Sequence, residues 1–307
     1  MTDTTADTPA TARMDRWIGA AAALATVSIW AFWIVGTRHA VATHFDVWGI
    51  GLLRYGLPAL ILAPVWLRMP LLPRELGPLT AVGLLGAGAP FFLAVATGMT
   101  FAPASDAGPL LPGTMPLFVA ALSALVLHQR IGPVRAVGLA LMVAGVAAIG
   151  GHAVFESTSG AWRGHLLFLS GALMWAIYTL AFRRSGLTAL QGAALVSLWS
   201  TILLLPLGLP SLIGAVRAGL IGDLLVQTVV QGLLSGVISV ILYGVAVRRL
   251  GAAPASAFAA LVPGMAAGLA VPMLGEALSW ATLAGIAAST AGVMLASGAL
   301  GGAGPRR

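Results

Sequence analysis

The chain has 307 residues, of which 59% are hydrophobic and only 8% are charged, and its formal net charge is +7. About a quarter of the residues in a soluble domain are charged, so this composition excludes an ordinary water-soluble protein. The chain has no cysteine, which excludes disulfides and thiolate metal sites. Its basic residues are all arginines scattered in ones and twos, which argues against nucleic acid as a partner.

A helix needs about 20 mostly apolar residues to cross the hydrocarbon core of a membrane. Residues 1–16 are polar and lack the pattern of a signal peptide, so we expect a disordered cytoplasmic tail, with a second tail at 301–307. The two connections expected to be long are 151–162 and 211–224. Between the tails the sequence predicts ten spans, at 17–37, 47–67, 76–98, 103–127, 132–150, 163–182, 190–210, 225–247, 253–274 and 279–299.

The arginines predict the orientation of these spans, because cytoplasmic loops are enriched in basic residues. With the N-terminus in the cytoplasm, the loops expected on the outside hold only Arg38, Arg163 and Arg217, and Arg54 lies within a span. The remaining twelve fall in the inside segments as six pairs, and both termini are then cytoplasmic.

The two halves of the sequence resemble each other. Ile29–Trp33 reads Ile-Trp-Ala-Phe-Trp, and Met174–Tyr178 reads Met-Trp-Ala-Ile-Tyr. Ala-Pro-Ala-Ser opens both the fourth and the ninth span, and each is followed by a Pro-Gly pair at the same separation. Five spans per half is an odd number, so the repeats 17–150 and 151–300 are expected to insert in opposite orientations. Such inverted repeats are common in secondary transporters, whose substrate site lies near the midplane between the halves.

Two further features are the arginine in the second span and Leu274–Leu278, which reads Leu-Gly-Glu-Ala-Leu. With the inverted repeats, they resemble the EamA type of the drug/metabolite transporter superfamily. The resemblance covers nearly the whole chain. It implies a central cavity surrounded by helices 1–4 and 6–9, with helices 5 and 10 at the periphery. The sequence departs from the pattern at Gln129, which occupies the first-half position of Glu276. The aromatic content further resembles the bacterial aromatic amino acid exporters of the YddG type.

Two charged residues are candidates for contact with a substrate. Arg54 lies within the second span, where a charge is costly and usually faces a cavity or a partner. It is interpreted either as a contact for a substrate carboxylate or as a structural or snorkelling residue. Asp106, near the start of the fourth span, is interpreted either as a proton-coupling or ammonium-binding group or as a helix N-cap.

Aromatic residues form the second set of candidates. Trp30 and Trp33 lie on one stripe of the first span, and Trp175 and Tyr178 lie on the corresponding stripe of the sixth. By pseudo-symmetry these stripes are expected to face each other and to line the cavity, since Trp and Tyr offer flat faces to an aromatic or cationic solute. Ordinary helix packing is the alternative. Further cavity candidates are Phe101, Met115, Trp199, Ser239 and Tyr243.

Proline and glycine are the candidates for moving parts. A proline inside a helix removes a backbone hydrogen bond and bends the helix, so the fourth and ninth spans are expected to be gating helices or, alternatively, to have static kinks. Glycines in the fifth and tenth spans predict close helix packing or a homodimer contact through those two helices. The candidate hinge residues are Pro109, Pro112, Gly113, Pro116, Pro263 and Gly264.

We therefore expect an all-α polytopic protein of the bacterial inner membrane that exports small organic metabolites by alternating access, with neutral or aromatic amino acids as substrates. A sugar-phosphate or nucleotide-sugar carrier and a non-transporting membrane scaffold are the alternatives. No phosphate loop, nucleophile elbow or cluster of metal ligands is present in the sequence, so no enzyme activity, cofactor or metal is expected. The expected partners are a small-molecule substrate and the lipid bilayer.

Overall fold

The computed structural model describes residues 9–73, 76–155 and 160–297, and within these ranges the chain is helical and contains no strand. The helices of the first half are α1 (Pro9–Thr43), α2 (Val47–Ile61), α3 (Ala63–Trp66), α4 (Pro78–Leu84), the 3₁₀ helix η1 (Leu85–Ala87), α5 (Ala89–Phe101), α6 (Ala104–Leu110), α7 (Met115–Leu127) and α8 (Pro133–Phe155).

The second half continues in the same manner, with helices that follow one another closely. They are α9 (Ala161–Ser185), α10 (Ala189–Arg217), α11 (Ile221–Gln227), the π-helix η3 (Thr228–Ile238), α12 (Ser239–Leu250), α13 (Ala252–Ala257), the 3₁₀ helix η4 (Phe258–Leu261), α14 (Val262–Leu274) and α15 (Trp280–Ala296).

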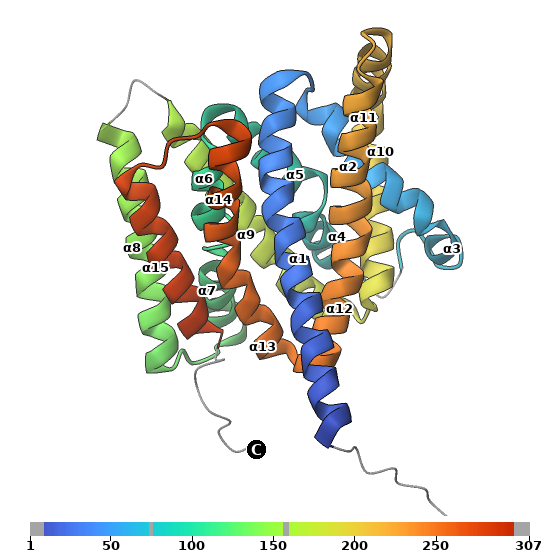
Figure 1. Cartoon of the computed structure of the whole chain (residues 1–307). Helices are drawn as coiled ribbons and strands as arrows, with labels where there is room; N and C mark the ends of the chain where they lie inside the picture. Colours follow the sequence, from blue (N-terminus) through green and yellow to red (C-terminus); the bar gives the residue numbers. More distant parts are fainter. Residues whose placement is uncertain (1–8, 74–75, 156–159, 298–307) are drawn as a thin grey trace, which may run out of the picture.

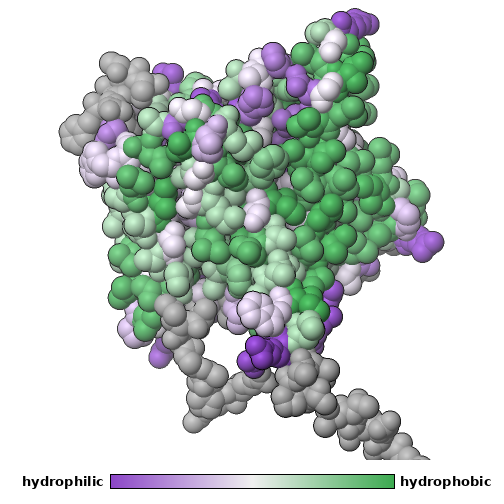
Figure 2. Space-filling view, in the orientation of Figure 1, coloured by the Kyte–Doolittle hydropathy of each residue, from purple (hydrophilic) through white to green (hydrophobic). Residues whose placement is uncertain are grey.

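Eight helical segments of the described chain are long and apolar enough to cross a membrane. Two further apolar helices, α2 and α15, are shorter. At 1.5 Å per residue the 17 residues of α15 extend about 26 Å, slightly less than a hydrocarbon core of about 30 Å. Figure 2 shows hydrophobic residues over the middle of one face and hydrophilic residues at its two ends, as expected for a protein embedded in lipid.

The helices form one bundle, and the start of α1 and the end of α15 lie at the same end of it (Figure 1). We call this the lower end, and the opposite end, where α1 finishes and α9 begins, the upper end. Long-range packing joins the two halves: α2 packs along α10, α6 along α14, α8 along α15, α1 along η3 and α12, and α9 along α4 and α5.

Five of the expected spans are not continuous α-helices. The second is interrupted at Leu62, between α2 and α3. The fourth is interrupted between α6 and α7, and the ninth passes through the 3₁₀ helix η4. Two of the candidate hinge prolines, Pro112 and Pro263, therefore lie at or next to a change in helical geometry. The third span is interrupted at Gly88, and the eighth contains the 11-residue π-helix η3. The irregularities in the second, third and eighth spans were not predicted from the sequence.

Two expectations about segments outside the spans are wrong. The first helix begins at Pro9, inside the predicted disordered tail, because proline is well tolerated in a first turn and the residues that follow include good helix formers. An ion pair between Asp15 of α1 and Arg249 of α12 fixes this extension. Residues 1–8 and the predicted tail 301–307 lie outside the described part of the chain.

The predicted long connections are also mostly helical. The segment 211–224 holds the end of α10, at Arg217, and the start of α11, at Ile221. The segment 151–162 holds the end of α8 and the start of α9, and its residues 156–159 lie outside the described part. Two prolines inside α10, Pro206 and Pro210, do not end the helix, since a helix can tolerate proline when the local backbone adjusts.

The glycines of α8 and α15 pack these two helices against each other within one chain. A Cβ atom on Gly138 would lie 2.7 Å from the backbone oxygen of Gly292, and one on Gly145 would lie 3.3 Å from that of Gly285. Of the two interpretations offered for these residues, close helix packing is therefore correct. A homodimer through the two helices stays a prediction, and it would have to use other faces of them.

Candidate functional site

Arg54 lies between three helices in the interior of the bundle. Its Nη1 donates to the hydroxyl of Ser235 on η3 at 2.7 Å, and its guanidinium carbon lies 4.7 Å from the ring centre of Trp33 on α1. Its Nε is buried and has no hydrogen-bond partner. None of the ion pairs found in the described part of the chain includes Arg54.

The close approach of α2 and η3 places Arg54 beside Ser235. A Cβ atom on Gly232 would lie 2.8 Å from the backbone oxygen of Leu53, and one on Gly236 would lie 2.5 Å from Pro58. Larger residues at these two glycines would push η3 away from α2. The start of α2 is fixed by Asp46, whose side chain accepts a hydrogen bond from the backbone N–H of Gly49 at 2.8 Å.

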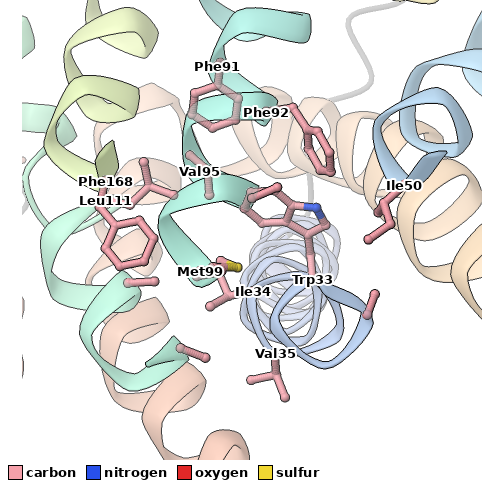
Figure 3. Close-up of a cluster of buried hydrophobic side chains, with 14 of the residues drawn as sticks. Trp33, Ile34, Val35, Ile50, Phe91, Phe92, Val95, Met99, Leu111 and Phe168 are labelled. Atoms are coloured by element: carbon pink, nitrogen blue, oxygen red, sulfur yellow. The ribbon is translucent and has the colours of Figure 1, made fainter. Parts of the chain in front are cut away.

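Trp33 is held by polar residues of the π-helix. Its indole Nε1 donates to Oε1 of Gln231 at 2.8 Å, and Nε2 of Gln231 donates to Thr37 at 3.0 Å and to Gln227 at 3.2 Å. Gln231 is fully buried, so these bonds satisfy an amide that would otherwise be costly to enclose. The indole of Trp33 points from α1 toward Phe91 and Phe92 of α5 (Figure 3).

Gln227, Gln231 and Ser235 were not among the predicted site residues, although their spacing in the sequence indicates a polar helix face. Together with Ser239 and Tyr243, which were predicted, they recur every four residues along the eighth span. Residues four apart lie on one face of a helix. A polar face of this kind in an otherwise apolar span indicates contact with a partner or a cavity.

Aromatic side chains form a continuous column from α1 through α5 to α9. The ring centres are 6.4 Å apart for Trp33 and Phe91, 5.5 Å for Phe91 and Trp175, and 5.4 Å for Trp175 and Tyr178. Tyr178 continues the column to Phe182 at 5.7 Å. The stripes of the first and sixth spans therefore meet, but through Phe91, which the sequence analysis did not select. We call Trp33, Phe91, Trp175 and Tyr178 the aromatic column.

Trp30 lies outside this column. Its ring packs against Tyr243 of α12 at 5.7 Å, so the expectation that it would face Trp175 is not supported. Ser239, on the same face of the eighth span, is buried and donates to the backbone oxygen of Ser235 at 2.8 Å. Met115, at the start of α7, is partly buried against the same core as the aromatic column.

Asp106 belongs to a separate buried network near the upper end. Its carboxylate oxygens lie 2.9 Å from Nε2 of His165 on α9 and accept from the hydroxyl of Thr282 on α15 at 2.7 Å. The helix-cap interpretation is wrong: the side chain that caps α6 is that of Glu276, which accepts from the backbone N–H groups of Ala104 and Ser105 at 2.7 and 2.8 Å. This network and that of Arg54 share no residue, so the structure does not support grouping the two in one cavity.

Two further candidates lie away from the aromatic column. Phe101 is 41% exposed and packs beside Arg163, whose guanidinium carbon is 6.0 Å from its ring centre. Trp199 on α10 donates its indole N–H at 2.9 Å to the backbone oxygen of Leu71, which lies in the connection between α3 and α4. Both were selected for being aromatic. Phe101 is the last residue of α5 and packs at the upper end, whereas Trp199 lies within α10 and contacts a connecting segment.

The candidate hinge residues lie where the fourth and ninth spans meet. A Cβ atom on Gly108 of α6 would lie 2.8 Å from the Cα of Pro263 of α14, so the two helices touch at that point. Pro109 is inside α6, Pro112 and Gly113 lie in the break, and Pro116 is in the first turn of α7. Gly264 follows Pro263 in the first turn of α14. In the described part of the chain no group of three or more His, Asp or Glu residues could hold a metal ion.

Comparisons with known proteins show the family of the chain. The sequence profile of the EamA-like transporter family matches the chain twice, over residues 17–151 and 162–298. A protein of Streptantibioticus cattleyicolor named "Probable terminal-alkyne amino-acid exporter" is 31% identical over 260 residues, which cover 82% of this chain and 84% of the relative. A crystal structure that is 18% identical superposes with a TM-score of 0.54, covering 92% of this chain and 95% of the other, which shows similarity of fold.

Proposed function

Because this chain belongs to the EamA-like transporter family, we propose that it is a secondary transporter that exports neutral or aromatic amino acids by alternating access. The observation that carries the proposal is the aromatic column, which begins beside Arg54 and runs between helices of the two halves. Its flat apolar faces suit the side chain of such a substrate. The name of the bacterial relative also supports an amino acid as the exported solute.

The chain spans the membrane ten times, as the two inverted repeats 17–150 and 151–300. The packing of the helices supports this division, because the pattern of main contacts stays the same when each helix is replaced by its counterpart in the other half. The contact of α1 with α12 becomes that of α9 with α4 and α5, while those of α2 with α10, α6 with α14 and α8 with α15 map onto themselves. The arginine pairs support cytoplasmic termini, so that the lower end faces the cytoplasm of a bacterial inner membrane.

Access alternates through movement of the fourth and ninth spans. Their upper halves, α6 and α14, are packed together, and Glu276 links the loop after α14 to the first turn of α6. Arg38 of α1 adds to this contact, with its Nε 3.9 Å from the Glu276 carboxylate. Exposure of the substrate to the outside requires these contacts to separate, and the breaks at Pro112 and before Pro263 provide the points of bending.

Proteoliposomes test this proposal. Vesicles containing the purified protein should exchange labelled phenylalanine faster than threonine, and both faster than protein-free vesicles, because the aromatic column favours an apolar side chain. Replacing Phe91 with Ala should lower phenylalanine exchange at least about tenfold, since it interrupts the column. Replacing the lipid-facing Leu203 with Ala is the matched control. No exchange of either amino acid by folded protein would contradict the proposal.

A further inference from the structure

The charge of Arg54 is not neutralised within the part of the chain that the structure describes. Its contacts there are the neutral hydroxyl of Ser235, the face of Trp33 and the more distant ring of Tyr55. A cation in a membrane span normally pairs with an acid or faces a water-filled cavity. Acids near the upper end are already engaged: Asp106 by His165 and Thr282, Glu276 by Arg38 and the first turn of α6, and Asp46 by the backbone N–H of Gly49.

The guanidinium also has an unfilled hydrogen-bonding edge. Nη1 is occupied by Ser235, whereas Nε is buried and bonded to nothing. A buried donor without an acceptor is unfavourable unless another group binds there. The edge of a guanidinium that carries Nε matches the two oxygens of a carboxylate, which it can bind through two parallel hydrogen bonds.

The surroundings of Arg54 define what is attached to that carboxylate. The guanidinium lies against the ring of Trp33, and Trp33 is the first member of the aromatic column. An anion bound at Arg54 therefore has flat apolar surfaces beside it, leading toward Trp175. One guanidinium matches the single negative charge of a carboxylate better than the double charge of a phosphate ester.

From these contacts we infer that Arg54 is a binding site for the carboxylate of the substrate, and that the substrate's apolar side chain extends from it along the aromatic column. The inference rests on the proposed function, since it assigns the part of the transport site that recognises the acid group. It assigns the two parts of substrate recognition to different helices. The carboxylate is bound at α2, and the apolar side chain is bound at α5 and α9.

Gln231 then acts as a positioning residue for this site. It holds the indole N–H of Trp33 at 2.8 Å, and the same amide is anchored to Thr37 of α1. Trp33 in turn supports one face of the Arg54 guanidinium. Replacing Gln231 with Leu would leave the indole N–H buried without an acceptor and should weaken carboxylate binding without removing any group that touches the carboxylate.

Binding to the purified protein in lipid nanodiscs tests the inference without requiring transport. The probes are 3-phenylpropanoate and 3-phenylpropanamide, which have the same size and differ in the carboxylate. The rise in Tm over a concentration series gives the apparent Kd of each probe. The carboxylate should bind at least about tenfold more tightly than the amide, and L-phenylalanine should compete with it.

Substitutions test whether Arg54 is the residue that prefers the carboxylate probe to the amide probe. Arg54→Gln should reduce the ratio of the two dissociation constants to about one, because a neutral amide cannot replace the charged pair. Arg54→Lys keeps the charge but loses the two-nitrogen edge, so an intermediate ratio is expected. Arg163→Gln, at a guanidinium that packs on Phe101 and Trp162, is the matched control and should keep the wild-type ratio.

Equal binding of the two probes to the wild-type protein would overturn the inference, and so would a preference that survives in Arg54→Gln. If Arg54→Gln does not fold, the comparison of Arg54→Lys with the wild type decides. Carboxylate-selective binding without any amino acid exchange in vesicles would support the site and contradict the transport proposal. Amino acid exchange in vesicles without a preference for the carboxylate probe would support the transport proposal and contradict the site at Arg54.

Discussion

Asp106 illustrates how, at the scale of single residues, a membrane-embedded acid can be structural. It accepts hydrogen bonds from two helices, from His165 of α9 and from Thr282 of α15, and it lies on a third. Ser279 adds to the network, since its hydroxyl accepts from the backbone N–H of Thr282. This arrangement ties the upper part of α6 to helices of the second half, so its first expected effect is on stability.

Replacing Asp106 with Asn should therefore lower the free energy of unfolding. The amide is neutral and has one acceptor oxygen where the carboxylate has two. The hydrogen bonds to His165 and Thr282 therefore lose the assistance of the charge, and one of them must reverse its direction, at a cost of about 1–3 kcal/mol. Thermal unfolding in lipid nanodiscs measures the change. Asp223→Asn, at an exposed position in the first turn of α11, is the control and should leave Tm unchanged. An equal Tm for the two variants would show that the network does not stabilise the fold.

At the scale of the helices, the packing depends on glycines at which two backbones approach closely. Gly86 of η1 is the tightest example, since a Cβ atom there would lie 2.2 Å from the backbone oxygen of Met174 on α9. Without a side chain at this position, the third span can lie directly on the backbone of α9, which brings Phe91 into contact with Trp175. The aromatic column thus depends on a glycine that is not part of it.

Replacing Gly86 with Ala should separate α9 from the third span. Backbone atoms cannot yield locally, so a loss of several kcal/mol in the free energy of unfolding is expected, at the upper end of what single substitutions cost. Thermal unfolding and phenylalanine exchange should both fall. Gly268→Ala in α14 meets no atom within 4 Å and is expected to be neutral or to stabilise by about 0.5–1 kcal/mol. Similar effects of both substitutions would contradict the packing described for Gly86.

Like Gly86, the π-helix η3 positions residues of the site, here on the side of Arg54. It spans 11 residues, whereas π-helical geometry usually covers a single turn and is frequent at functional sites. It presents Gln231 to Trp33 and Ser235 to Arg54. These two contacts join the eighth span to the first and second, so the geometry of η3 sets the position of both the aromatic column and the charge.

The whole molecule is organised by the pairing of its two halves. Every main contact between helices either joins two equivalent helices or has a counterpart in the other half. The two charged candidates do not follow this symmetry: Arg54 and Asp106 both lie in the first half, and the structure gives them separate networks. The scaffold is shared by both halves, whereas these two charged residues belong to the first half alone.

Reporter fusions test the orientation of the whole chain. A fluorescent protein fused after Arg307 should fluoresce, because the C-terminus is expected in the cytoplasm, and alkaline phosphatase at that site should be inactive. Alkaline phosphatase inserted at Gly219, between α10 and α11, should be active, because this connection is expected outside. The opposite pattern of reporter activity would contradict the proposed orientation, and the upper end would then face the cytoplasm.

The sequence by itself determined the membrane class, the family resemblance, the all-helical character and the positions of two proline breaks. These features follow from composition and from local patterns, since lipid requires a continuous apolar helix and proline acts on its own backbone. It also selected Arg54, Trp33, Trp175 and Tyr178, which the structure connects in series through Phe91.

Only the tertiary structure decided which groups these residues contact. Trp33 meets Gln231 across 198 positions, and the first turn of α6 is capped by Glu276 from 172 positions away. Such contacts depend on the rotation and separation of whole helices, which are set by glycines at the crossings and by the irregular geometry of η1 and η3. Hydropathy along the chain carries no information about that rotation, so Phe91, Gln231 and the buried Asp106–His165 pair became evident only after the helices were packed.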